Sequence, residues 1–445
     1  MTVFLFIVAF ILIMLLGIIF TRFIGVVFLK PSILSFFLLF YIINAYIGIL
    51  FLYLGWNEYS VNINITDQTT ILKLWSYSSL SLFLILIGFW YSKNVLKLDI
   101  QSYPQFKEHN LQIKGLNSRS YVLAIFIFII SCFVFLLYLT KIPKIPIIAM
   151  LTGANTMEVQ LLRSLATNDF SGYLWYSLFF NQIMVFISFI FFANLLIKQT
   201  RLSILIFAFT FLITSFALIV PTHKAPIILY LLGLGIIYLL VKGKKIKVGF
   251  IIKIGVISVP ILILMYQYIM GMQGRPIIDV VQAILSRLFI GQISPAYFYL
   301  EIFPDIEEFK FGSTFPNPGG IFPWENYRLT VEVANLWFPD RAASGVVGSA
   351  PTVFWGEMYV NFGFLGVIFS SIVVGIILSV SQHLINNLKV NSISISIYVM
   401  LIFEFIKLTQ TGFSMLFFNF RLLVIILVGI SLLLMNRTTK RGVDL

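Results

Sequence analysis

The sequence predicts an all-α polytopic membrane protein, and three observations point to that fold class. Hydrophobic residues make up 60% of the 445 positions and charged residues only 11%, against roughly 25% charged residues in a soluble globular protein. The mean hydropathy is +1.01. Apolar runs of about 20 residues, the length that crosses a hydrocarbon core, recur along the whole chain. These observations exclude a soluble fold.

Apolar runs bounded by charged residues or by Gly and Pro clusters are expected to be about eleven transmembrane helices, within a range of ten to twelve. The first run has no basic n-region and no small-residue cleavage site, so we expect it to remain as a helix and not to be removed as a signal peptide. No polar linker separates the halves, which predicts a single integral membrane domain over residues 1–445. The predicted helices cover residues 2–20, 33–54, 74–91, 121–140, 173–197, 203–220, 227–241, 249–269, 361–384, 394–409 and 422–435.

Lys and Arg on the connections predict the orientation, because short cytoplasmic loops carry an excess of basic residues. Alternate connections separate into one set with eighteen basic residues and another with twelve on or near the opposite face. The first set, which includes the C-terminal tail, is predicted to be cytoplasmic. The second set is predicted to face outward and comprises residues 55–73, 141–172, the turn at Pro221 and the segment 270–350. The N-terminus is therefore expected outside and the C-terminus in the cytoplasm.

Arginine is enriched on the predicted outer side. Five of the eighteen cytoplasmic basic residues are arginine, compared with six of the twelve outer ones. A guanidinium group binds phosphate or carboxylate through two parallel hydrogen bonds, whereas lysine is a less directional charge. This distribution indicates an outward-facing anionic ligand, although each cation taken alone is also typical of a membrane-surface anchor. The candidate cations are Arg275, Arg287, Arg328, Arg341, Arg421 and Lys224.

The segment 270–350 is expected to be a long extracytoplasmic loop that folds onto the membrane. It holds eight of the 17 acidic residues and seven of the 15 prolines, and its many aromatic residues argue against disorder. An interfacial helix is predicted near its start, with Val280 and Ile284 on the apolar face and Pro295 as its end. Carboxylates and amides beside aromatic rings suit sugars, but aromatic anchors at a bilayer surface have the same composition.

Glu357 is the candidate general base. It precedes the predicted helix 361–384, near the outer membrane surface, where a carboxylate is costly unless it is solvated, paired or used in chemistry. The alternative is an acidic residue at a helix start, favoured by the helix dipole. The neighbouring glycines Gly356, Gly363 and Gly366 are interpreted as positions of close helix packing.

Other sequence features restrict the types of reaction that we expect of this chain. Glu404 and Lys407 are i,i+3 neighbours within a predicted span and are expected to neutralise each other, with a role along a substrate path as the alternative. The sequence has no Asp-x-Asp pair, no GxxxxGK[ST] loop and no GxSxG elbow, and His223 is its single predicted outward histidine. The net charge of +13 is not gathered on one soluble face, which argues against a nucleic-acid partner. We therefore expect a reaction without metal, nucleotide or other cofactor.

This layout resembles that of the bacterial Wzy-type oligosaccharide repeat-unit polymerases, which make O-antigen, common antigen, capsule or exopolysaccharide. The shared features are ten or more helices, a long outward loop late in the sequence, basic residues after the middle spans, and a Gly-Glu-x-Tyr-x-Asn-Phe-Gly string that here runs from Gly356 to Gly363. Two features differ. Lys224 stands where members commonly have arginine, and the paired Arg-x10-Gly loop motifs of some members are absent.

The resemblance implies a metal-independent, lipid-linked glycosyltransferase with a GT-C-like bundle, located in the bacterial cytoplasmic (inner) membrane with its active site outside. It implies a glycan donor on undecaprenyl pyrophosphate, an acceptor repeat unit on the same lipid, and a flippase and a chain-length regulator as pathway partners. Glu357 would deprotonate the attacking hydroxyl, which Tyr359 and Asn361 would position. Cations would hold the leaving pyrophosphate, with Arg287 and Arg341 as catalytic groups and Arg275, Arg328, Arg421 and Lys224 as binding groups.

Two other functions stay open. An O-antigen ligase would use the same lipid-linked donor and relies on an outward histidine, for which His223 is the candidate. A polysaccharide flippase or other transporter would carry charges through the membrane midplane and have short outer loops. The concentration of charge in the predicted outer segments argues against the transporter, and the presence of only one candidate histidine favours the polymerase over the ligase.

Overall fold

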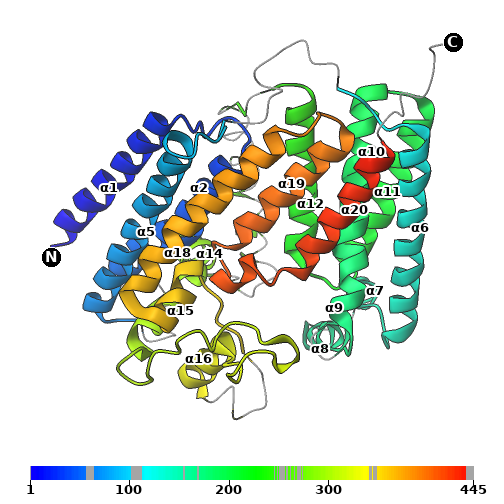
Figure 1. Ribbon diagram of the computed structural model, residues 1–445. Helices are drawn as coiled ribbons and strands as arrows, with labels where there is room; N and C mark the ends of the chain where they lie inside the picture. Colours follow the sequence, from blue (N-terminus) through cyan, green and yellow to red (C-terminus); the bar gives the residue numbers. More distant parts are fainter. Residues whose placement is uncertain are drawn as a thin grey trace. The chain divides into compact units, whose positions relative to one another are not determined.

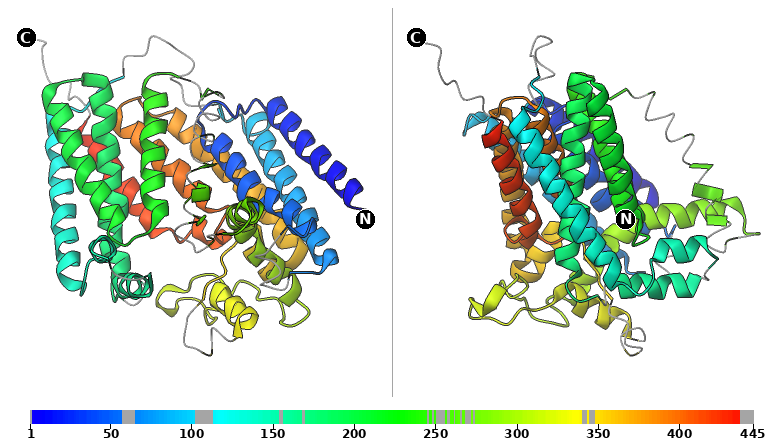
Figure 2. Two further views of the ribbon diagram at one scale, coloured as in Figure 1. Left: turned by 180° about the vertical axis from the view of Figure 1, so that it is seen from behind. Right: turned by 90° about the vertical axis from the view of Figure 1, so that its right-hand side faces the viewer.

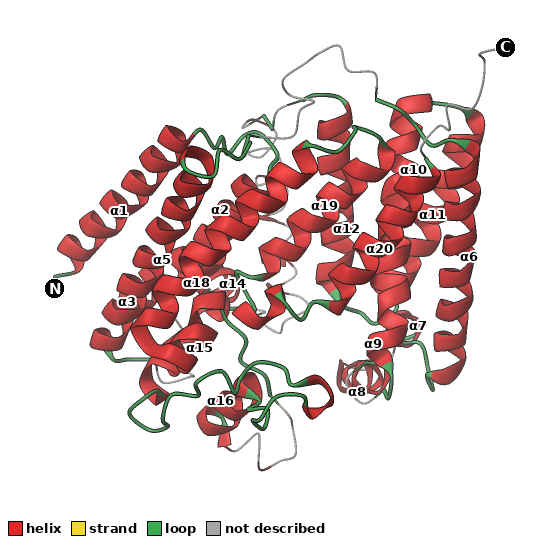
Figure 3. Ribbon diagram, viewed as in Figure 1, coloured by secondary structure: helices red, strands yellow, loops and turns green. Residues whose placement is uncertain are grey.

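The computed structural model describes most of the chain. The described residues are 2–56, 65–101, 113–153, 156–167, 170–244, 274–339 and 348–436, together with Ala343 and scattered positions between 246 and 272. They form helices joined by turns and loops (Figure 3). Contacts between residues divide the chain into two compact units. The prediction of a single integral domain is not tested by this division and stays a prediction.

The first unit comprises Met1–Ser102, Lys245–Asn386 and Glu404–Phe418. Two of its long segments contain a π-helical turn, at Ile42–Tyr46 (η1) between α2 and α3 and at Ser286–Ile290 (η4) between α14 and α15. Its helices are α1 (Val3–Ile24), α2 (Ile33–Tyr41), α3 (Ile47–Tyr53), α5 (Gln68–Asn94), α14 (Ile277–Leu285), α15 (Gly291–Ile302), α16 (Leu329–Trp337) and α18 (Phe354–Asn386), with the 3-10 turns η5 (Pro318–Gly320) and η6 (Phe413–Leu416).

The second unit comprises Tyr103–Lys244, Asn387–Phe403 and Asn419–Leu445. It holds most of α19 (Ser392–Lys407), whose last four residues belong to the first unit. Its other helices are α6 (Ser118–Lys141), α7 (Pro146–Leu151), α8 (Thr156–Ala166), α9 (Tyr173–Ser177), α10 (Met184–Lys198), α11 (Arg201–Ile219), α12 (Lys224–Val241) and α20 (Phe420–Met435), with the π-helical turn η3 (Leu178–Ile183) between α9 and α10.

The predicted fold class is confirmed. Nine helical segments among the described residues are long and apolar enough to cross a membrane. Eight coincide with predicted spans, and the spans predicted at 227–241 and 394–409 are present as the shorter helices α12 and α19. The span predicted at 249–269 lies largely outside the described residues. The ninth segment is Ile277–Ile302, within the predicted outer loop.

Two predicted helix boundaries are wrong. Pro295 does not end a helix, because α15 continues through it to Ile302. The helix is buried without interruption over residues 293–300, and such packing overrides the local penalty of a proline. Helix α18 begins at Phe354, seven residues before the predicted position, so that Glu357 lies in its first turn.

Direct backbone contact joins α5 and α18, which run side by side (Figure 1). A Cβ atom added to Gly88 would lie 2.7 Å from the Ile372 carbonyl oxygen, and one added to Gly375 would lie 2.5 Å from the Ile85 carbonyl oxygen. Small residues allow this approach, which is typical of helix pairs in membranes. On the other side of α5, Gly17 brings α1 against Leu82, and α1 lies alongside α5 (Figure 2).

The second unit packs by the same means. A Cβ atom on Gly233 of α12 would lie 2.3 Å from the Phe189 ring of α10, so the helix axis can approach the ring only at a glycine. The buried Tyr138 hydroxyl of α6 donates to the carbonyl of Ala166 at 2.8 Å, which fixes the end of α8. The helices of this unit are thus held by close packing and buried hydrogen bonds.

Gly375→Ala is expected to destabilise the protein by about 1–3 kcal/mol, because the added methyl group overpacks the α5–α18 contact. The measurement is the midpoint of thermal unfolding of purified protein in detergent. Gly235→Ala is the matched control, since nothing lies within 4 Å of its added Cβ atom. An unchanged midpoint for Gly375→Ala would contradict direct backbone packing.

Candidate functional site

A break in α18 organises the most polar part of the first unit. Phe362 and Gly363 have non-helical dihedral angles, and Gly363 has φ 58° and ψ −143°, a conformation open to glycine. The Phe309 ring would lie 3.1 Å from a Cβ atom added to Gly363, and the Met358 carbonyl oxygen 2.1 Å from one added to Gly366. Gly363 and Gly366 are therefore tightly packed, but their neighbours are the loop and the preceding turn of α18, not another helix as the sequence interpretation expects.

The loop that follows α15 attaches at this break. The backbone amides of Lys310 and Phe311 donate to the carbonyls of Val360 and Asn361, at 2.9 and 3.2 Å. A helix end leaves carbonyl groups that need donors, and the loop supplies two of them. The Gly312 amide adds a third hydrogen bond, to Asn361 Oδ1 at 2.6 Å.

Asn361 connects the loop to the candidate base. Its side chain is fully buried, and its Nδ2 donates to Thr314 Oγ1 at 2.6 Å and to the Glu357 carbonyl at 2.8 Å. The Thr314 hydroxyl in turn donates to Glu357 Oε1 at 3.2 Å. The amide thus fixes the threonine, and the threonine fixes one oxygen of the carboxylate.

A second segment holds the Glu357 carboxylate from the other side. Ser414 donates its backbone N–H to Oε2 at 2.7 Å and its hydroxyl to Oε1 at 2.9 Å. The backbone at Gly412 passes so close that a Cβ atom there would lie 2.5 Å from Oε2. Glu357 is only 6% exposed, and these donors satisfy a buried carboxylate that would otherwise be costly.

The Glu357 carboxylate lines a polar cavity of about 370 Å³, here called the polar cavity. Arg328, exposed at the N-terminal end of α16, is the cation in its lining and forms no ion pair with a described carboxylate. The cavity therefore combines a fixed carboxylate, a guanidinium group and several hydroxyl groups. Its lining includes Tyr299, Thr314, Tyr327, Arg328, Thr330, Thr352, Glu357, Thr411, Gly412 and Ser414.

An apolar groove of about 680 Å³ lies against the same wall. Thr314, Glu357 and Ser414 line the polar cavity. Their neighbours in the chain, Phe315, Met358 and Phe413, line the groove. The rest of the groove is lined mainly by aromatic and aliphatic side chains of α18, the loop after α15 and the residue after η6. Its lining comprises Phe309, Phe311, Phe315, Met358, Phe362, Leu365, Gly366, Phe369, Val373, Phe413 and Phe417.

An ion pair fastens the loop beside the polar cavity. Lys310 Nζ lies 2.7 Å from Glu307 Oε2 and 4.3 Å from the centroid of the Tyr327 ring, whose hydroxyl donates to the same oxygen at 2.8 Å. Burial opposes ionisation of Glu307, but the hydrogen bonds from Lys310 and Tyr327 and the Lys310 charge outweigh it and lower the pKa of the carboxyl group. Burial and Glu307 together raise the pKa of Tyr327. Because Tyr327 lines the polar cavity, this pair positions part of its wall.

The structure brings only part of the predicted set together. Glu357 and Arg328 share the polar cavity, whereas the exposed Arg275 and Arg287 do not line it. Tyr359 and Asn361 are buried and engaged internally, Tyr359 through a 3.0 Å hydrogen bond from its hydroxyl to the Phe303 carbonyl. Their predicted role in orienting a substrate hydroxyl stays a prediction.

The remaining predicted cations lie elsewhere. Arg421 is in the first turn of α20, in the second unit. Lys224 begins α12, and its side chain lies outside the described part of the chain. Arg341 also lies outside the described residues. Glu404 and Lys407 form the predicted i,i+3 ion pair, with the Glu404 side chain 5% exposed.

Sequence reasoning missed the partners of Glu357. Thr314 lies 43 residues before it and Ser414 lies 57 residues after it, so no local spacing connects them. The string Gly356 to Gly363 did contain a signal, because a glycine that ends a polar helical turn is typical of a backbone position with positive φ. The string did not indicate which distant residues meet at the break.

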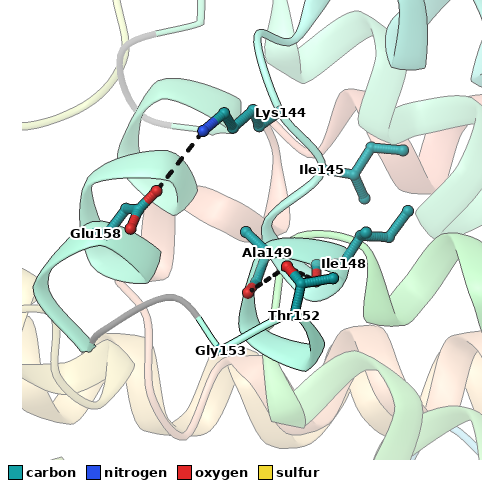
Figure 4. A pocket seen from close by; sticks show the side chains of 7 residues that line it. All are labelled: Lys144, Ile145, Ile148, Ala149, Thr152, Gly153 and Glu158. Carbon is teal, nitrogen blue, oxygen red and sulfur yellow. Dashed lines mark hydrogen bonds and ion pairs between the residues drawn. The ribbon is translucent and has the colours of Figure 1, made fainter.

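A second polar hollow, in the second unit, lacks the features of a reactive site. It measures about 570 Å³ and lies beside α7 and α8. Its two charged groups, Lys144 and Glu158, lie 3.8 Å apart. Figure 4 shows this pair and the hydrogen bonds from the Thr152 hydroxyl to the carbonyls of Ile148 and Ala149. Both charges are exposed and the hydroxyl is satisfied within its own helix, so this hollow offers no group poised for chemistry.

Comparisons with protein-family models, with curated proteins and with solved structures find no match to this chain.

Lys310→Met is expected to lower the free energy of unfolding by about 1 kcal/mol at pH 7, because it removes a partly buried ion pair. The lowered pKa means that ionised Glu307 stabilises the folded state above its ordinary value of 4.5, and that this contribution is lost as the pH falls through the lower folded-state pKa. The difference between wild type and variant should therefore shrink below pH 4.5. Denaturant unfolding in detergent at several pH values measures it.

Lys144→Met is the control for Lys310→Met, since its pair with Glu158 is long and exposed and should contribute little. A Lys310→Met effect that is constant from pH 7 to pH 3 would contradict the role assigned to Glu307.

Proposed function

We propose that this protein is a membrane glycosyltransferase that polymerises oligosaccharide repeat units carried on undecaprenyl pyrophosphate. The growing glycan is transferred to the acceptor sugar of a new repeat unit, and undecaprenyl pyrophosphate is released. The reaction takes place at the outer face of the bacterial cytoplasmic membrane. A flippase and a chain-length regulator of the same pathway are its expected partners.

One observation carries the proposal: a polar cavity with a buried carboxylate adjoins an aromatic groove across a single wall. A lipid-linked sugar has the same two parts, a hydroxylated head and a hydrocarbon chain. The sugar would occupy the polar cavity, and the first isoprene units of its carrier would lie in the apolar groove, where hydrophobic burial stabilises them.

The proposed chemistry uses Glu357 as the general base. Its oxygens are held by Ser414 and Thr314, so the carboxylate is positioned before the substrate arrives. The acceptor hydroxyl oxygen attacks the anomeric carbon of the donor sugar while Glu357 takes its proton. The bond from that carbon to the pyrophosphate oxygen breaks, and Arg328 stabilises the charge that develops on the leaving group.

Glu357→Gln is expected to reduce chain extension by about 10²–10⁴-fold, the usual contribution of a general base. The chromosomal copy is replaced by the variant, and surface glycan is separated on a ladder gel. Single-repeat glycan is expected in place of long chains, with normal amounts of the protein in the membrane. Glu308→Gln removes an exposed carboxylate of the same loop and should leave the ladder unchanged.

Arg328→Ala is expected to shorten the ladder in the same way, and Arg287→Ala tests the cation that lies away from the polar cavity.

A normal ladder with Glu357→Gln would contradict the proposed base. Deletion of the gene distinguishes the alternatives, because carrier-bound polymer would indicate a ligase and repeat units that are not translocated would indicate a flippase.

A further inference from the structure

The loop between α15 and α16 contains a short segment whose conformation is fixed by one side chain. Asn317 Nδ2 donates to the carbonyls of Phe322 and Trp324 at 3.1 and 2.7 Å, and its Oδ1 accepts from the Phe322 amide at 2.9 Å. The turn η5 brings the chain back toward the asparagine, because its two glycines adopt positive φ angles. The segment 317–324, here called the aromatic tip, is therefore held by its own hydrogen bonds.

The aromatic tip presents a stacked pair of rings. The Phe322 and Trp324 rings lie almost parallel, with centroids 4.7 Å apart and 7° between their planes. Phe322 is 37% exposed, and Ile321 beside it is 79% exposed. The face of an aromatic ring carries partial negative charge and attracts groups with a positive edge. The stack thus offers a flat ring surface at a fixed position, which reduces the entropy lost when a ligand binds.

The aromatic tip adjoins the polar cavity. Thr314, just before the tip, and Asn326, two residues after Trp324, both line that cavity. The Tyr327 amide donates to the Ser313 carbonyl at 2.8 Å and closes the base of the loop. Two residues of chain span at most about 7 Å. The stacked rings therefore lie close to the cavity in which the proposed reaction takes place.

The charges around the aromatic tip favour a sugar over the bilayer surface as its ligand. Segments that dock on a membrane surface are rich in Lys and Arg, which are attracted to anionic lipid headgroups. Between Lys310 and Arg328 the sequence has a single charged residue, the acidic Glu325, which directly follows Trp324. Lys310 itself is paired with Glu307. The tip therefore lacks the cations of a membrane anchor.

We propose that the aromatic tip is a binding platform for a pyranose unit of the growing glycan. One face of a pyranose ring carries C–H groups, which lie against the Phe322 ring while the hydroxyl groups remain in water. The adjoining sugars of the same chain occupy the polar cavity. This inference rests on the proposed function and adds a second contact to it, which retains the glycan between successive transfers and so lengthens the product.

Binding of carrier-free glycan to the purified full-length protein tests the platform. The probe is the surface glycan of the host strain, released by mild acid, and titration calorimetry in nonionic detergent gives its dissociation constant. Phe322→Leu is expected to weaken binding by about tenfold, because it keeps an apolar side chain but removes the ring. Phe322→Tyr keeps the ring and should bind as the wild type does. Ile321→Ala is the matched control, since it removes a more exposed apolar side chain of the same tip.

The ladder gel gives a second readout. Phe322→Leu should lower the most abundant chain length, while chains of several repeats persist, because the platform retains the glycan but takes no part in bond formation. This pattern differs from the single repeats expected of Glu357→Gln. Ile321→Ala should leave the ladder unchanged.

Three results would overturn the platform: no glycan binding by the wild type, unchanged binding with Phe322→Leu, or an equal loss with Ile321→Ala, which would indicate a general apolar contact. Failure of the proposed function gives a different pattern. A normal ladder with Glu357→Gln would refute the proposed base, while ring-dependent glycan binding would still support the platform. Single repeats with Glu357→Gln but no glycan binding would support the base and refute the platform.

Discussion

The arrangement of the candidate site depends on the hydrogen bonds between the break in α18 and the loop after α15. The break at Gly363 interrupts the N-terminal part of α18 and leaves helical carbonyls there, and the amides of Lys310 and Phe311 donate to those of Val360 and Asn361. Backbone groups buried without partners are costly. The loop is therefore tied to the helix at the point where the helical hydrogen-bond ladder is interrupted.

Burial makes this attachment cooperative. Asn361 uses its amide to bond the Gly312 N–H, the Thr314 hydroxyl and the Glu357 carbonyl, and each group left without its partner would cost roughly 1–3 kcal/mol. Loss of one bond thus weakens the others. The same network fixes Thr314 against the Glu357 carboxylate, so the geometry of the loop and the position of the proposed base are coupled.

The sequence predicted the fold class and most spans, because apolar length and charge spacing are local properties. It also singled out Glu357 from a carboxylate beside an apolar run. It could not predict that Ser414 would bond this carboxylate or that the helix would continue through Pro295, because both result from packing between distant segments. Nor could it select Arg328 over Arg287, since their distances from the polar cavity are set by tertiary structure.

Amide hydrogen exchange over residues 304–315 tests the central claim most directly. In the wild type, the amides of Lys310 and Phe311 should exchange at least about 100-fold more slowly than unprotected loop amides, because the helix carbonyls hold them. Gly363→Ala, which imposes a side chain at φ 58°, should remove that protection, whereas Gly235→Ala should preserve it. Unprotected exchange in the wild type, or protection that survives Gly363→Ala, would contradict the account.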